Sequence, residues 1–150
     1  MRARFFFMLY LCILPLGQGY ARAADIMAFS ERVLLQSLSL NYQTVQEQLK
    51  TVSYYYTPAA WQSLNGFLDE KITYIQDNQL ILHPTVIKKP ELTQEGTISG
   101  VHYSSIRQNF NIPELKLILE TVVVVIGNDI NTLKIQSVNM IQLPNMPSEF

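Results

Sequence analysis

Cysteine is nearly absent from this 150-residue chain, and so are the spacings that mark common catalytic and metal sites. The one cysteine is Cys12, and the only histidines, His83 and His102, lie far apart in the sequence. No CxxC, HxH, HExxH or GxSxG pattern and no Gly-rich phosphate loop occurs. We therefore expect no disulfide, no cofactor and no metal site built from closely spaced ligands.

Charged residues are also scarce, and neither sign is concentrated. They make up 15% of the chain, with 11 basic and 12 acidic residues and a formal net charge of −1. The only adjacent basic pair is Lys88-Lys89. Because nucleic-acid-binding proteins usually carry a clustered basic patch, we expect no nucleic acid as a partner. The hydrophobic content of 48% is enough for one packed domain.

The first 23 residues have the pattern of a cleavable export signal. A basic start, MRAR, precedes the apolar run FFFMLYLCILPLG, and the small-x-small pattern ARA follows at residues 21–23. The apolar run has 13 residues and contains Pro15, whereas a membrane-spanning helix needs about 20 apolar residues. We predict a signal peptide at residues 1–23 and one periplasmic domain at residues 24–150. An uncleaved membrane anchor is the alternative.

The hydrophobic pattern predicts helices in the first half of the exported part and strands in the second. Apolar residues recur at helical spacing from Asp25 to Leu40, which predicts an amphipathic helix that begins near Asp25. The stretch NYQTVQEQLKTV predicts a turn and a short polar helix, and AAWQSLNGFLDEKITYIQ continues the helical pattern. From Leu80 onward, β-branched residues alternate with turn signals.

The second half predicts a run of antiparallel strands. The segment LKLILETVVVVI predicts a strand whose far end is covered on both faces. GNDIN predicts a hairpin connection, and TLKIQSVNMIQL predicts the return strand. The alternation slips within this strand, which predicts a bulge near residues 136–137. Helices followed by antiparallel strands predict an α+β fold, with the N-terminal helices packed on one face of a curved sheet.

The stretch YYYTPAAWQSL, residues 54–64, carries the signals of a helix start. Thr57 is a favoured N-cap, and Pro58 suits the first helical position. Tyr56 then lies one residue before the cap, and Trp61 is the fourth helical residue. Packing between these two positions forms a hydrophobic staple. We therefore predict core or capping roles for Tyr56, Thr57 and Trp61.

Two tyrosines, Tyr54 and Tyr55, have no part in that helix start. Tyrosine combines a large contact area with a polar tip, so either residue is a candidate interaction residue. If Trp61 anchors the core, its replacement by alanine should cost about 3–5 kcal/mol, the range for a buried aromatic residue. Replacement of Tyr54 by alanine should cost far less.

The same part of the chain resembles a known family. The stretch SLNYQTVQEQLKTVSYYYTPAAWQSL is similar to the periplasmic domain of the IcmL/DotI family of type IVB (Dot/Icm) secretion and related conjugation machines. Its members are also described as macrophage-killing proteins similar to conjugation proteins. The family has an Asn-Tyr pair after the first helix, matched by residues 41–42. An aromatic-threonine pair and a tryptophan follow, matched by residues 56–57 and Trp61. The resemblance covers roughly residues 25–143.

The resemblance implies a fold and a function. The implied fold is like nuclear transport factor two or cystatin, with long helices curled against a strongly bent antiparallel sheet. The implied function is a non-catalytic periplasmic interaction or scaffold domain, with other envelope or secretion-system proteins as partners. Membrane association would then come only through those partners or through an uncleaved signal. The resemblance leaves open whether the chain forms a homo-oligomer, and whether it is a core component of a machine or a soluble paralogue.

A small periplasmic enzyme of isomerase or dehydratase type is the alternative, because the same fold hosts such enzymes in its cone-shaped cavity. Acid–base catalysis needs a carboxylate or a histidine within an apolar pocket. The candidates are Asp69, Glu70, His83 and His102. A buried carboxylate or histidine on the concave face of the sheet would favour an enzyme, and an aliphatic lining would favour a scaffold.

Overall fold

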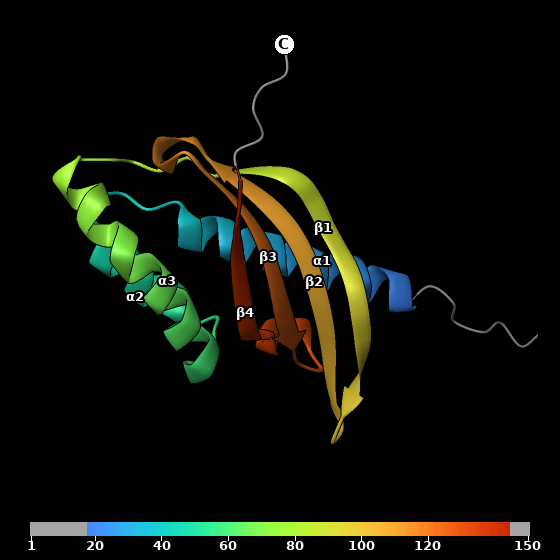
Figure 1. Ribbon diagram of the computed structural model, residues 1–150. Helices are drawn as coiled ribbons and strands as arrows, with labels where there is room; N and C mark the ends of the chain where they lie inside the picture. The colour runs from blue at the N-terminus through green and yellow to red at the C-terminus, as the bar shows by residue number, and fades with distance from the viewer. Residues whose placement is uncertain (1–17, 145–150) are drawn as a thin grey trace, which may run out of the picture.

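The structure, a computed structural model, describes residues 18–144. Its regular elements are α1 (Gln18–Leu38), α2 (Val45–Ser53), α3 (Pro58–Asp77), β1 (Thr85–Ile98), β2 (Val101–Ile112), β3 (Leu117–Ile126) and β4 (Lys134–Leu143), with short 3-10 turns η1 (Pro113–Leu115) and η2 (Ile130–Thr132). The strands form one antiparallel sheet in the order β1-β2-β3-β4. Long bent strands cross α1, while α2 and α3 lie beside the β4 edge (Figure 1). This confirms the predicted α+β fold.

Helix α1 begins earlier than the hydrophobic pattern predicts. The pattern places its start near Asp25, but the helix begins at Gln18 and continues through residues 23–24, where cleavage of a signal peptide is predicted. The Arg22 Nη2 atom donates a hydrogen bond of 2.6 Å to the carbonyl oxygen of Gly127, which follows β3. The additional turns therefore contact the sheet through a polar group, which a search for apolar periodicity does not detect. Residues 1–17 of the predicted signal lie outside the described part of the chain.

Within residues 18–144, no helix is both long enough and apolar enough to cross a membrane.

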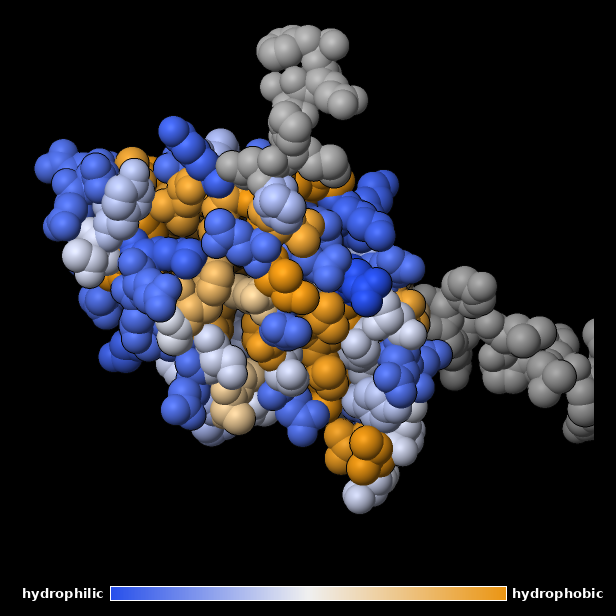
Figure 2. Space-filling model, in the orientation of Figure 1, coloured by the Kyte–Doolittle hydropathy of each residue, from blue (hydrophilic) through white to orange (hydrophobic). Residues whose placement is uncertain are grey.

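The core lies between the helices and one face of the sheet. On β3 this face consists of Leu117, Leu119, Thr121, Val123 and Val125, all of which are buried. The side chains that alternate with them are only half-buried, so the prediction that the far end of this strand is covered on both faces is wrong. Figure 2 shows the resulting apolar surface over the middle of the sheet, on the face turned away from α1.

Strand β4 contains the bulge predicted near residues 136–137. Ile135 pairs with Val125 and Ser137 pairs with Val124, so Gln136 is the additional residue. The bulge allows Ile135 to remain in the core while the rest of the strand continues with a shifted alternation.

The segment before α3 is hydrogen-bonded to the free edge of β4. The Thr57 amide donates to the Ile135 carbonyl, and the Ile135 amide donates to the Tyr55 carbonyl, both at 2.8 Å. Tyr56 and Ile135 accordingly form an isolated parallel bridge. The Thr57 hydroxyl also accepts a hydrogen bond from the Ala60 amide, which caps α3. The aromatic stretch is therefore fixed at the junction of helix and sheet.

Candidate interaction site

Tyr56 is the most deeply buried aromatic residue of the stretch 54–64. It is 5% exposed, and its ring centroid lies 5.8 Å from that of Trp61, which is half-buried. The Ser37 hydroxyl donates to the Val33 carbonyl at 2.8 Å and lies 2.7 Å from the Tyr56 hydroxyl. Because a serine hydroxyl has one proton, Tyr56 must be the donor to Ser37. The structure thus places Tyr56, rather than Trp61, deepest in the core.

Burial raises the pKa of the Tyr56 phenol well above its usual value of 10.0. A raised folded-state pKa gives stability that is complete below the unfolded-state pKa and is lost as the pH rises above it. We therefore expect the free energy of unfolding to fall above about pH 10. Urea denaturation should show a smaller fall for Tyr56→Phe, whereas Tyr54→Phe should behave as the wild type. Equal falls in all three proteins would contradict this assignment.

Tyr54 and Tyr55 lie on the surface beside the buried Tyr56. Tyr54 is 71% exposed and Tyr55 is half-buried. Their rings meet edge to face, with centroids 5.7 Å apart, and Tyr55 meets Phe29 of α1 in the same manner at 6.1 Å. Three aromatic side chains from two separate parts of the chain therefore form one continuous cluster, which runs from the buried Phe29 to the exposed Tyr54.

Two basic side chains lie on this aromatic cluster. The guanidinium carbon of Arg32 is 5.3 Å from the Tyr55 ring centroid and 5.6 Å from that of Phe29. The Lys134 Nζ atom is 3.6 Å from the Tyr54 ring centroid and also donates a hydrogen bond to the Tyr54 carbonyl. Each arrangement is a cation–π contact. We name Phe29, Arg32, Tyr54, Tyr55 and Lys134 the basic–aromatic ladder.

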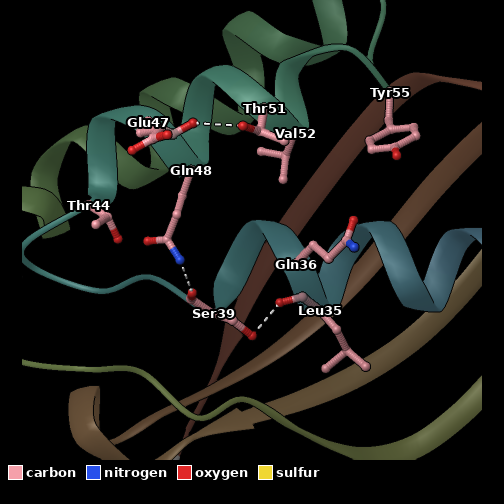
Figure 3. A pocket seen from close by; sticks show the side chains of 9 residues that line it. All are labelled: Leu35, Gln36, Ser39, Thr44, Glu47, Gln48, Thr51, Val52 and Tyr55. Carbon is pink, nitrogen blue, oxygen red and sulfur yellow. Dashed lines mark hydrogen bonds between the residues drawn. The ribbon is translucent and has the colours of Figure 1, made fainter.

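Two hollows adjoin the ladder, and Tyr55 lines both. The larger, of about 590 Å³, is a groove between α1 and α2 (Figure 3). Its lining consists of Leu35, Gln36, Ser39, Thr44, Glu47, Gln48, Thr51, Val52 and Tyr55. The smaller, of about 340 Å³, is lined by residues 130–133 and by all five members of the ladder. The lining of the groove combines apolar and hydrogen-bonding side chains with a single carboxylate, that of the exposed Glu47. Such a lining suits the binding of a ligand better than acid–base chemistry.

The acid–base candidates lie apart on the surface. Asp69 and Glu70 are exposed on α3. His83 is also exposed, and its Nδ1 atom lies 2.7 Å from the Glu114 carboxylate. Slight burial raises the pKa of Glu114, but hydrogen bonds from its own backbone and from His83 outweigh this and lower it overall. Glu70 and Glu114 both line a hollow of about 420 Å³ between α3 and the start of β3, but neither Asp69 nor His83 lines it.

The fourth candidate, His102, is the second residue of β2 and is half-buried. Its Nε2 atom is 3.9 Å from the Glu95 carboxylate, which is exposed. The helix-covered face of the sheet instead buries uncharged polar residues, namely Ser104, Gln108 and Thr121, among aliphatic and aromatic side chains. Within residues 18–144, no three His, Cys, Asp or Glu side chains converge as a metal site would require.

Several solved structures share this arrangement of helices on a curved sheet. A periplasmic fragment of TraM superposes with a TM-score of 0.70 at 14% identity, covering 81% of this chain and 98% of that one. The periplasmic domain of DotI gives 0.61 at 13% identity, covering 77% and 91%. An IcmL-like type IV secretion system protein from Legionella pneumophila subsp. pneumophila str. Philadelphia 1 gives 0.62 at 14% identity, covering 85% and 96%. At such low identity these likenesses establish the fold.

The sequence itself establishes the family. Residues 9–110 match the model of the DotI/IcmL family, described as an inner-membrane complex component of the type-IVb secretion system. Because the match spans more than half of the chain, this protein belongs to that family, as the residues around the aromatic stretch predict. The match begins before the predicted domain start, within the predicted signal. No curated protein is significantly similar to the chain.

Proposed function

We propose that this protein is a non-catalytic, periplasmic interaction domain of a type IVB-like envelope assembly. Its partners would contact the basic–aromatic ladder and the adjoining groove between α1 and α2. The observation that carries the proposal is the ladder itself, in which the exposed Tyr54, the half-buried Tyr55 and two cations lie beside that groove. Tyrosine, arginine and other aromatic residues are enriched where protein interfaces concentrate their binding energy.

The family and its solved relatives support the setting of this proposal. The family is described as an inner-membrane complex component, which favours function within an assembly. The solved relatives are described as a periplasmic fragment of TraM and a periplasmic domain of DotI, which favours the same compartment for this chain. The scattered acid–base candidates support a role that does not involve catalysis.

Site-specific photo-cross-linking in intact cell envelopes tests the proposal. A photoreactive phenylalanine analogue is placed at Tyr54 and, as a control, at Tyr74 of α3, which is 53% exposed. We expect the Tyr54 probe to capture a secretion or conjugation component at least about fivefold more efficiently than the Tyr74 probe, because binding energy concentrates at a few residues. Recovery of no such component from Tyr54, or equal recovery from both positions, would refute the proposal.

Whether the domain is released into the periplasm or remains anchored in the membrane depends on cleavage of the predicted signal peptide. We expect the mature chain to begin at Ala24, because the short apolar run is followed by a signal-peptidase pattern. Cleavage there would remove Arg22 and its hydrogen bond to Gly127 but would keep Ile26 and the later core residues of α1. Mass spectrometry of the native protein provides the test. An intact Met1 start in the membrane fraction would show that the segment is an anchor.

A further inference from the structure

The chemistry of the basic–aromatic ladder identifies the class of partner segment that it fits. We propose that the ladder binds an acidic segment of another protein, whose carboxylates pair with Arg32 and Lys134 while its apolar side chains contact Tyr54 and Tyr55. This inference rests on the proposed function, because it specifies the partner of the same surface. It adds the sign of the partner's charge and the two residues that recognise it.

Arg32 and Lys134 keep donors available for a partner. Within residues 22–144, the carboxylates that lie close to a lysine or histidine side chain contact Lys88, His83 and His102, and none of them contacts Arg32 or Lys134. In that part of the chain Arg32 makes only its two ring contacts, so its five N–H groups are uncommitted. Lys134 gives one of its three N–H groups to the Tyr54 carbonyl. An arginine fork matches both oxygens of a carboxylate, and a lysine adds a second positive charge.

The rings hold both cations in place before a partner arrives. Contacts of Arg32 with Phe29 and Tyr55, and of Lys134 with Tyr54, restrict two long side chains that would otherwise lose rotamer freedom on binding. The carboxylate that precedes η2, Asp129, accepts a hydrogen bond of 2.8 Å from the Asn131 amide. This carboxylate therefore caps the η2 turn. The smaller hollow is thus lined by two positively charged side chains whose positions are already restricted by the aromatic rings.

The size and lining of the two hollows favour a peptide segment. The smaller hollow, of about 340 Å³, accommodates a few side chains, and Ile130 at its margin is 50% exposed. Through Tyr55 the surface continues to the larger groove, where Leu35 and Val52 supply apolar contacts. A segment that carries carboxylates among apolar residues would match both features. Such a segment buries apolar surface while its charges remain paired.

An anionic membrane surface is the main competing class of partner. Segments that recognise anionic lipids typically carry about four to eight clustered basic residues, whereas the ladder has two. The two cations are also seated on aromatic rings of a cleft, an arrangement that suits individual carboxylates better than a plane of headgroups. The observations therefore favour a protein segment.

Selection from a random dodecapeptide library on the immobilised protein tests the inference directly. We expect selected peptides to contain Asp and Glu at least about threefold more often than the unselected library, because charge-assisted pairs dominate recognition by Arg and Lys. The double variant Arg32→Glu, Lys134→Glu should instead enrich Lys and Arg. Lys71→Glu is the matched control, since Lys71 lies 4.1 Å from the Phe67 ring centroid in a separate cation–π pair on α3. It should leave the acidic enrichment unchanged.

Four results would contradict the inference that the ladder binds an acidic protein segment. It fails if no acidic enrichment occurs, if the double variant keeps the acidic preference, or if Lys71→Glu abolishes it. It also fails if vesicles of phosphatidylglycerol, but not of phosphatidylcholine, bind the wild type and lose binding in the double variant, because the ladder would then recognise lipid. The library result does not depend on secretion components, whereas cross-linking from Tyr54 does. Failure of the two proposals can therefore be told apart.

Discussion

Replacement of Tyr56 by alanine should lower the free energy of unfolding by about 3–5 kcal/mol, the range for deleting a buried aromatic side chain. The side chain is 5% exposed and packs against Trp61. Its hydroxyl donates to Ser37, whose own proton is used by the Val33 carbonyl. The substitution therefore leaves a cavity between α1 and α3 and removes a buried hydrogen bond. Urea denaturation monitored by circular dichroism measures the loss.

Three other variants separate the contributions to this effect. Tyr56→Phe removes only the hydroxyl and should cost about 0.5–1.5 kcal/mol, as for one buried hydrogen bond. Trp61→Ala should cost less than Tyr56→Ala because Trp61 is half-buried. Tyr54→Ala should stay within about 0.5 kcal/mol of the wild type, as for surface positions. A larger loss for Trp61→Ala than for Tyr56→Ala would contradict the order of burial seen here.

The sequence pattern predicts the start of α3 but does not show which of its two aromatic residues is buried more deeply. Thr57 and Pro58 are local signals, since capping and backbone preference act within a few residues. The depth of Tyr56 instead depends on distant segments. Its bridge to Ile135 of β4 and its hydrogen bond with Ser37 of α1 both arise only when the chain has folded. The expected large cost for Trp61→Ala assumed that the staple residue on the helix is the anchor.

Only part of the candidate interaction site could be predicted from the sequence, because its residues come from distant segments of the chain. The exposed position of Tyr54 could be anticipated because the helix start does not use it. Arg32 and Lys134 could not be anticipated, because each is an isolated basic residue on α1 or β4. They meet the tyrosines only because the bulge at Gln136 and the edge hydrogen bonds of Ile135 bring the loop before α3 onto β4. No pattern of neighbouring residues in the sequence predicts contacts between such distant segments.

Replacement of Gln108 by methionine should raise the free energy of unfolding by about 1–3 kcal/mol, because the cost of burying an unpaired amide is removed. The Gln108 side chain is 0% exposed and lies on the same face of β2 as Ile106 and Phe110, which are also fully buried. Neither its Nε2 nor its Oε1 atom has a hydrogen-bond partner among the described residues. Methionine has a similar length and flexibility, so it can fill the same space without polar atoms.

Thr121 provides the matched control, because it lies opposite Gln108 on β3 and is equally buried. Its hydroxyl donates a hydrogen bond of 3.0 Å to the Gln108 backbone carbonyl, which Gln108→Met retains. Thr121→Val removes that bond at nearly constant volume and should lower stability by about 0.5–1.5 kcal/mol. Two substitutions of neighbouring buried polar residues should therefore have opposite signs. Thermal and urea denaturation of both variants provide the test, and a loss of stability in Gln108→Met would mean that the amide is paired inside the core.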